Sequence, residues 1–121
     1  MFGLILTRAE VNGRAATLVV DTGSNHTVLS SGILSIRPLA LENTVTASKG
    51  SGYTGRAAWT KATLEIGPTL WRDQRVLVMD DFQDLSASLK QKVDGILGAD
   101  LLREFEFVIM DFKHHRLMLV R

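Results

Sequence analysis

The sequence predicts a mostly β domain with a barrel-like or sandwich architecture, and three observations support this prediction. Short apolar runs rich in β-branched residues recur along the chain, separated by glycine, proline and asparagine. Helical periodicity is confined to short stretches of the second half. The 121 residues contain no internal repeat and suffice for a single domain with one core.

The first half of the chain predicts two hairpins. The first turns at Asn12-Gly13, a dipeptide typical of a two-residue type I′ turn. The second has a glycine-rich tip, Gly50-Ser51-Gly52, which we expect to be exposed and mobile. We expect Ser30-Ser31-Gly32 to end a strand and Pro38 to impose a turn. The strands expected in this half are 4–11, 14–20, 27–29, 42–48 and 53–66.

The second half predicts further short strands and one or two short helices. Leu85 and Leu89 lie one helical turn apart in a polar segment, which favours a surface helix over 83–92. Leu101, Leu102 and Phe105 share one face of a predicted helix over 100–105. The strands expected here are 75–79, 93–98, 107–111 and 116–121.

Composition excludes several classes of function. The net charge is +1 and the basic residues are interspersed with acids, so we expect no nucleic-acid partner. The longest apolar run is well short of the roughly 18 residues of a membrane helix, so we expect no membrane segment in this chain. Residues 1–6 lack the basic lead of a signal peptide. The absence of cysteine excludes disulfides, thiol nucleophiles and cysteine zinc sites, and a domain excised from a larger protein would have the same features.

The most informative stretch is Leu18-Val19-Val20 followed by Asp21-Thr22-Gly23-Ser24. A buried strand that ends on a carboxylate removes much of that group's hydration. The loss is tolerable if the carboxylate accepts hydrogen bonds or shares its charge with a second group. Taken alone, the stretch is also typical of an Asx-turn after a strand.

A second motif narrows the interpretation. Ile96-Leu97-Gly98 follows Asp21-Thr22-Gly23-Ser24 by about 75 residues, and the pair in this order and spacing resembles the aspartic proteases. The chain length is similar to that of the single-domain, homodimeric, retropepsin-like families. The resemblance covers residues 1–121 and implies a retropepsin-like acid protease barrel.

The resemblance also implies the chemistry. The chain carries one Asp-Thr-Gly, so we expect a homodimer through the Asp21 loop that acts on a peptide or protein substrate. Two carboxylates about 3 Å apart share one proton, so one activates water as a general base and the other polarises the scissile carbonyl. No metal or other cofactor is expected. Thr22 would bond across the dimer axis, Gly23 would admit the substrate backbone, and Ser24 would donate its hydroxyl to ionised Asp21.

Other parts of the chain fit the same family with departures. Gly50, Ser51, Gly52 and Tyr53 correspond to a flap that closes over substrate. Asn25 and Ala99 stand where retroviral enzymes place an Asp–Arg ion pair that supports the dimer. The Gly98-Ala99-Asp100 pattern is more similar to cellular and bacterial retropepsin-like domains.

Several alternatives stay open. The domain could be a catalytically inactive dimerisation or peptide-binding module that keeps the fold, or an inactive monomer that needs flanking segments. Asp94 is a candidate for a second catalytic carboxylate in the same chain, although a turn or cap explains it more simply. His114-His115 is best explained by a solvated turn rather than a metal site, because adjacent strand residues point to opposite faces. The phosphate loop of actin-like ATPases is excluded by chain length.

Overall fold

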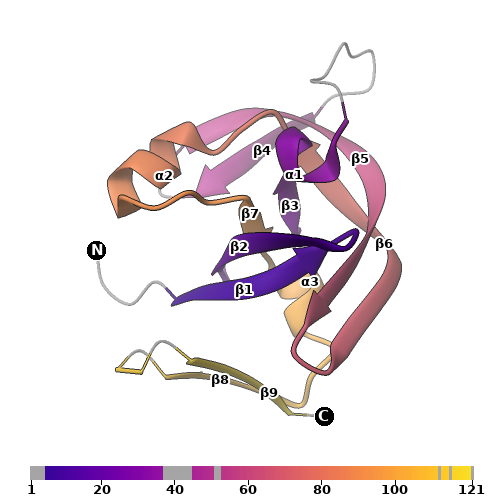
Figure 1. The fold of residues 1–121 in the computed structure, drawn as a ribbon, viewed down its shortest axis with the longest axis vertical. Coiled ribbons are helices and arrows are strands. Elements are labelled where there is room, and N and C mark those ends of the chain that lie inside the picture. The colour runs from indigo at the N-terminus through magenta and orange to yellow at the C-terminus, as the bar shows by residue number, and fades with distance from the viewer. Residues whose placement is uncertain (1–4, 37–44, 51–52, 112, 115, 121) are drawn as a thin grey trace.

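The structure is a computed structural model that describes residues 5–36, 45–50, 53–111, 113–114 and 116–120 (Figure 1). Among these residues, strands predominate and the three helices are short. The strands are β1 (Ile5–Val11), β2 (Arg14–Val20), β3 (Val28–Ser30), β4 (Val45–Gly50), β5 (Tyr53–Ile66), β6 (Thr69–Met79), β7 (Gly95–Leu97), β8 (Phe107–Asp111) and β9 (Arg116–Val120). The helices are α1 (Ser31–Leu34), α2 (Gln83–Leu89) and α3 (Ala99–Leu102).

The large sheet closes on itself. Its strand order is β1-β2-β7-β3-β6-β5-β4, and β1 also pairs with β5 through Val11 and Leu64. Six strands therefore form a closed barrel, and β4 extends from β5 outside the ring. This architecture confirms the predicted mostly β barrel. None of the described helices is long and apolar enough to cross a membrane.

The β1–β2 hairpin turns at Asn12-Gly13, as predicted. Both residues have positive φ, 50° and 82°, which is the geometry of a type I′ turn. The turn is also fastened to β5, because Asn12 N–H donates to Thr63 O at 2.8 Å and Asn12 Oδ1 accepts from Thr63 N–H at 2.9 Å. The hairpin is thus held at its tip as well as along its strands.

The strands β2 and β7 run parallel through the middle of the protein and are buried on both faces. Leu18 and Leu97 belong to one apolar cluster, whereas Val19 and Ile96 belong to the second cluster on the other side of the sheet. Each fully buried aliphatic side chain contributes roughly 1.5–3 kcal/mol to folding. The ends of β2 and β7 are therefore anchored by two cores at once.

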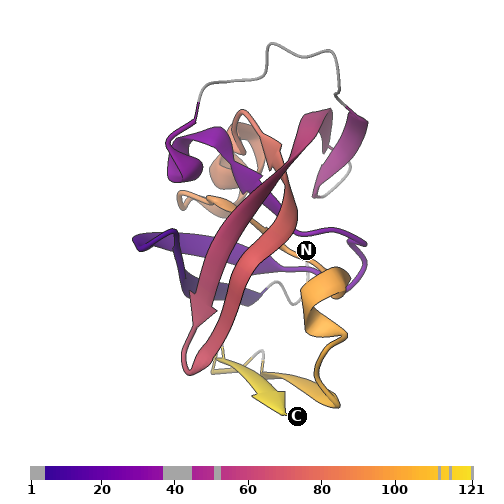
Figure 2. The ribbon, with the colours of Figure 1, turned by 90° about the vertical axis from the view of Figure 1, so that its right-hand side faces the viewer.

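The strand β6 is longer than expected, because the sequence predicted only 75–79. The additional residues pair with β5, from Ile66↔Thr69 to Leu64↔Trp71, after a tight turn with Gly67 at φ 55°. The polar run Arg72-Asp73-Gln74 hides this strand from the sequence pattern, and the pairing is irregular there, between Ala62 and Leu64. The β5–β6 hairpin spans the molecule from one end to the other (Figure 2).

The strands β4 and β5 form the second hairpin that the sequence predicted. Its backbone pairing runs from Val45↔Ala57 to Gly50↔Tyr53. Residues 42–44, which were expected to begin this strand, and the tip residues Ser51 and Gly52 lie outside the described residues.

The helices differ in detail from the prediction. The expected break at Ser30-Ser31-Gly32 is instead a single helical turn, α1, capped by Ser30 Oγ, which accepts from Ile33 N–H at 3.2 Å. A helix this short leaves no periodicity in the sequence. The predicted helices over 83–92 and 100–105 are present as the shorter α2 and α3.

The strands β8 and β9 form a separate two-stranded sheet below the barrel (Figure 1). One face packs against the larger apolar cluster through Val108, Met110, Leu117 and Leu119. On the opposite face Ile109 and Met118, which pair directly, are exposed. The last two predicted strands are therefore confirmed as a hairpin.

Candidate active site

The Asp21 loop begins where β2 ends. Asp21 N–H donates to Leu97 O at 3.0 Å, which continues the parallel pairing of β2 with β7 by one residue. Val20 is buried, Asp21 is half-buried, and Thr22 and Gly23 are exposed. The buried strand thus delivers a carboxylate to the protein surface on a rigid support.

One oxygen of Asp21 is held by its own loop. Gly23 N–H donates to Asp21 Oδ1 at 2.9 Å, and Ser24 N–H donates to Asp21 O at 3.2 Å. This is the Asx-turn that the bare motif allows. Within the described residues Oδ2 accepts no hydrogen bond, so the carboxylate is oriented through one oxygen while the other stays available.

The loop is clamped to the segment that follows β7 through Thr27 and Asp100. Thr27 is fully buried; its hydroxyl donates to Asp100 Oδ1 at 2.8 Å and its N–H donates to Oδ2 at 3.0 Å. The hydroxyl oxygen of Thr27 also accepts from Gly98 N–H at 3.0 Å. The Thr27 hydroxyl therefore both donates and accepts, and both oxygens of the Asp100 carboxylate accept. These bonds join the end of the Asp21 loop to the segment that follows β7.

Gly95 and Gly98 sit where this segment crosses β3 and the Asp21 loop. A Cβ on Gly98 would lie 2.6 Å from the carbonyl carbon of His26 and 2.9 Å from Ser24 O. A Cβ on Gly95 would lie 2.4 Å from Val28 O. Ala99 N–H also donates to Ser24 O at 2.7 Å. The Ile96-Leu97-Gly98 element thus touches the loop backbone directly, which only glycine permits.

The expected bond from the Ser24 hydroxyl to Asp21 is wrong. Ser24 Oγ donates instead to His26 O at 2.9 Å, across the turn of its own loop. A hydroxyl has one proton, and a carbonyl oxygen can only accept. Ser24 therefore stabilises the loop backbone and not the Asp21 carboxylate.

Asp94 is not a second catalytic group in the same chain. Its Oδ2 accepts from Thr17 N–H at 2.9 Å, and Lys92 Nζ lies 3.8 Å from Oδ1. Thr17 precedes Asp21 by four strand residues, so the two carboxylates are about 13 Å apart along β2. The interpretation of Asp94 as part of a turn is supported.

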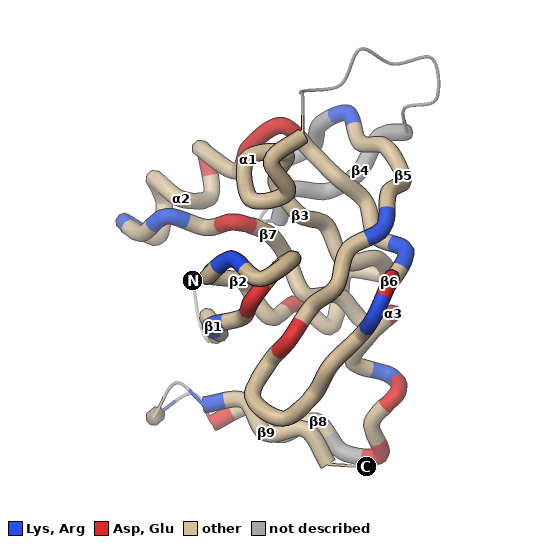
Figure 3. The backbone as a smooth tube through the Cα atoms, turned by 45° about the vertical axis from the view of Figure 1, so that its right-hand side comes forward, with Lys and Arg blue, Asp and Glu red and all other residues tan. Residues whose placement is uncertain are grey.

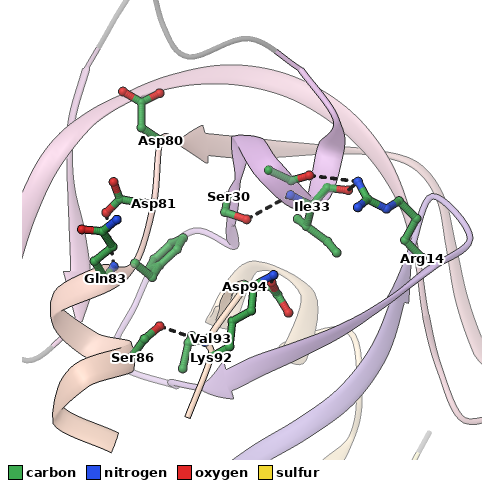
Figure 4. Close-up of a pocket in the computed structure, with 12 residues that line it drawn as sticks. Arg14, Ser30, Ile33, Asp80, Asp81, Gln83, Ser86, Lys92, Val93 and Asp94 are labelled. Atoms are coloured by element: carbon green, nitrogen blue, oxygen red, sulfur yellow. Dashed lines mark hydrogen bonds and ion pairs between the residues drawn. The ribbon is translucent and has the colours of Figure 1, made fainter. Parts of the chain in front are cut away.

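A cavity of about 450 Å³ lies at that end of the strands, away from Asp21 (Figure 4). Asp94 lines it together with Ser30, Ile33 and Phe82. At its rim Arg14 Nη1 donates to Gly32 O at 2.9 Å and to Ile33 O at 3.2 Å. The guanidinium thus pairs with carbonyl groups at the C-terminal end of α1, and these contacts of Arg14 are structural.

The remaining predicted site residues are placed as follows. Thr22 is exposed beside Asp21, and the backbones of Gly50 and Tyr53 pair at the end of the β4–β5 hairpin, whereas Ser51 and Gly52 lie outside the described residues. His114 is exposed in the β8–β9 turn, where its Nδ1 is 2.8 Å from Asp111 Oδ2. Across the residues that the structure describes, no three His, Asp or Glu side chains are grouped to hold a metal ion.

Sequence reasoning missed Thr27 and gave Asp100 no partner. The only signal was the Gly98-Ala99-Asp100 pattern, together with a threonine at the start of an apolar strand. Neither residue stands out alone, because threonine is common in strands and aspartate is common in the first turn of a helix.

Comparison with known proteins identifies the family and the fold. Residues 7–101 match the family model described as aspartyl protease. A search of curated proteins gave no match. The fold is similar to a retropepsin-like aspartic protease from Rickettsia conorii, with a TM-score of 0.63 and 22% identity over 89% of this chain and 76% of that one.

Two further solved structures have similar folds. The retroviral protease-like domain of Ddi1 from Leishmania major has a TM-score of 0.57 and 16% identity, over 98% of this chain and 90% of that one. EIAV protease complexed with the inhibitor HBY-793 has a TM-score of 0.57 and 20% identity, over 86% and 89% of the two chains. With the family match over residues 7–101, these likenesses show that the chain belongs to the aspartyl protease family and has the retropepsin-like fold.

Proposed function

We propose that this chain is an aspartic endopeptidase that hydrolyses peptide bonds as a homodimer, with Asp21 of each copy in one shared site. The observation that carries the proposal is the state of Asp21. Its strand is anchored in two cores, its Oδ1 is fixed by Gly23 N–H, and its Oδ2 accepts no hydrogen bond from the described part of the chain. An oriented and partly exposed carboxylate of this kind is suited to acid–base chemistry.

The reaction needs two such carboxylates that share one proton. The ionised Asp21 removes a proton from a bound water, and the oxygen of that water bonds to the scissile carbonyl carbon. The protonated Asp21 of the other copy donates to the carbonyl oxygen, which becomes a hydroxyl. The first Asp21, now protonated, gives its proton to the amide nitrogen, and the other Asp21, now ionised, takes a proton from one hydroxyl of the diol. The C–N bond then breaks to give an amine and a carboxylic acid, and the two carboxyl groups again share one proton. The chain has one Asp-Thr-Gly, so a single copy supplies half of this machinery.

The proposed dimer interface uses the same loop. In the proposed two-fold arrangement the Asp21 loop of one copy faces the same loop of the other, and Thr22 bonds across the axis; the exposure of Thr22 supports this role. The flap residues Gly50, Ser51, Gly52 and Tyr53 close over the bound peptide and exclude water. The family match and the retropepsin-like fold support this assembly.

Asp21→Asn tests the proposal. The amide cannot act as a base, so cleavage of a peptide library falls at least about a hundred-fold, while thermal unfolding and sedimentation remain close to those of wild type. Asp84→Asn is the matched control, because Asp84 lies exposed on α2. No cleavage by wild type as a purified dimer would instead identify a catalytically inactive module. Equal, measurable cleavage by the Asp21→Asn and wild-type proteins would show that Asp21 is not the catalytic group.

A further inference from the structure

A basic and aromatic surface lies beside the Asp21 loop. His26 follows Asp21 by five residues, and its ring meets Trp59 edge to face, with ring centres 5.1 Å apart and an angle of 86°. The Arg75 guanidinium lies over the Trp59 ring, 4.0 Å from its centre. We call the surface formed by His26, Trp59, Lys61 and Arg75 the basic patch.

The register of the barrel explains how the basic patch forms. Lys61 and Arg75 are direct partners on β5 and β6, and Trp59 is next to Lys61 on the same face of β5. The Lys and Arg segments of these two strands lie close together near α3 (Figure 3). Like charges directly opposite one another repel, so this pair is unfavourable without an anion nearby.

No such anion comes from the described part of the protein. Neither Lys61 nor Arg75 has a carboxylate within ion-pair distance there, and both side chains are exposed. Trp59 is 38% exposed, although an indole of this size is usually covered. A pair of cations around an open indole is the complement of an acidic group on an extended chain.

The contact with Trp59 also positions the Arg75 guanidinium to bind a carboxylate. The cation–π contact with the indole restricts the position of the guanidinium, and no hydrogen bond from its N–H groups is found within the described residues, so these donors are available to a carboxylate. A carboxylate can accept two parallel hydrogen bonds from such an edge, which gives both strength and direction. His26 fastens Trp59 to the loop, because the His26 backbone touches Gly98 and its carbonyl accepts from Ser24 Oγ at 2.9 Å.

The position of the basic patch relates it to the cleft. His26 belongs to the Asp21 loop, and Trp59 belongs to the strand β5 that forms the flap hairpin with β4. The patch therefore spans the two elements between which a peptide would lie. Five residues separate His26 from Asp21, so the His26 end of the basic patch is within about 17 Å of Asp21, which corresponds to about five residues of an extended peptide.

We propose that the basic patch recognises an acidic side chain of the peptide substrate, within about five residues of the scissile bond. The carboxylate of a substrate Asp or Glu bonds to Arg75 and is attracted by Lys61, while its aliphatic part packs on Trp59. This inference rests on the proposed peptidase function and names a feature of its substrate. It favours a peptide over nucleic acid, because the rest of the chain has nearly balanced charge.

The test uses matched peptides that differ only by Glu or Gln, with the substitution moved through the five positions on each side of the cut. At one or more positions wild type cleaves the Glu peptide with a higher kcat/KM than the Gln peptide. Arg75→Gln lowers this ratio about tenfold, as expected for the loss of one charge-assisted contact. Arg8→Gln, at an exposed arginine of β1, keeps the wild-type ratio.

Two further results separate recognition from a structural effect. Arg75→Glu reverses the preference, so that a Lys peptide is cleaved better than a Glu peptide. The wild-type ratio of the Glu and Gln peptides falls as salt is raised, because the contact is exposed. Equal kcat/KM for Glu and Gln at all ten positions, or retention of the ratio in Arg75→Glu, would overturn the proposal.

A binding experiment keeps this test distinct from that of the peptidase function. The tryptophan fluorescence of the Asp21→Asn variant, to which Trp59 and Trp71 both contribute, reports binding of the uncleaved Glu peptide at Trp59, and binding weakens about tenfold with Arg75→Gln. Failure of wild type to cleave any peptide, with this binding intact, would reject the peptidase and keep the patch. Tighter binding of single-stranded nucleic acid than of the Glu peptide would reject the patch as proposed.

Discussion

Thr27 and Asp100, 73 residues apart in the sequence, are joined by two hydrogen bonds, one from the Thr27 hydroxyl at 2.8 Å and one from its N–H at 3.0 Å. The same hydroxyl oxygen accepts from Gly98 N–H. Thr27, the residue that precedes β3, is therefore tied to the segment after β7, and the Asp21 loop has little freedom.

Thr27→Val should weaken both stability and activity. Valine fills the same space but leaves Gly98 N–H unpaired and removes one bond to the Asp100 carboxylate, at a cost of about 2–3 kcal/mol in the free energy of unfolding. Chemical denaturation measures this loss. Thr60→Val is the control, because Thr60 is half-buried on β5 and its hydroxyl has no hydrogen-bond partner among the described residues; it should change stability by less than about 0.5 kcal/mol. Equal effects of the two substitutions would contradict the role given to Thr27.

Gly98→Ala should be strongly destabilising. The added methyl group would lie 2.6 Å from the carbonyl carbon of His26, and backbone on both sides has to move, which costs about 1–3 kcal/mol or more. Gly32→Ala is the matched control, because Gly32 lies in α1 and its nearest contact would be the Ser30 side chain at 4.0 Å. The control should be neutral or slightly stabilising. Comparison of the two melting temperatures checks both expectations.

Ser24→Ala should act on the loop and not on the protonation of Asp21. The lost hydrogen bond to His26 O contributes about 0.5–1.5 kcal/mol, so the melting temperature falls modestly. The shape of the pH–rate profile should stay that of wild type, because the hydroxyl does not contact the carboxylate. A shifted acid limb with unchanged stability would show that Ser24 turns toward Asp21 in the dimer.

Asp111 supplies a pH-dependent contact in the β8–β9 turn. The hydrogen bond from the His114 side chain, aided by His114 N–H, holds the pKa of Asp111 below its ordinary value of 3.8. A lowered pKa stabilises the folded state above pH 3.8, and this contribution is lost as the pH falls through the folded pKa. In an NMR titration, His114→Ala should move the pKa of Asp111 upward. An unchanged titration would mean that the turn, and not His114, sets it.

The sequence was sufficient to predict features that depend on short motifs of neighbouring residues. Asn12-Gly13 predicted the first turn, and Asp21-Thr22-Gly23 with Ile96-Leu97-Gly98 predicted the retropepsin-like fold. The sequence was insufficient where structure depends on a distant partner. The Thr27–Asp100 bonds join residues whose proximity only the completed barrel creates, and the Ser24 hydroxyl had two acceptors within reach that sequence could not rank.

Three further features could not be predicted from the sequence: the helix α1, the start of β6 and the basic patch. The single turn of α1 is too brief for periodicity, and the start of β6 is masked by Arg72-Asp73-Gln74 although its pairing with β5 is continuous on either side. The basic patch has the same origin. His26, Trp59 and Arg75 are unremarkable in the sequence and meet only because β5, β6 and the Asp21 loop adjoin in the barrel.

The most direct test of a shared site is a mixing experiment with wild-type and Asp21→Asn chains that have exchanged subunits. If each active site needs Asp21 from both copies, activity per total chain follows the square of the wild-type fraction, and an equal mixture retains about a quarter of the wild-type value. If each copy works independently with its own Asp21, activity falls in proportion to the wild-type fraction and the equal mixture retains about half. The account predicts the first result, and the second would contradict it.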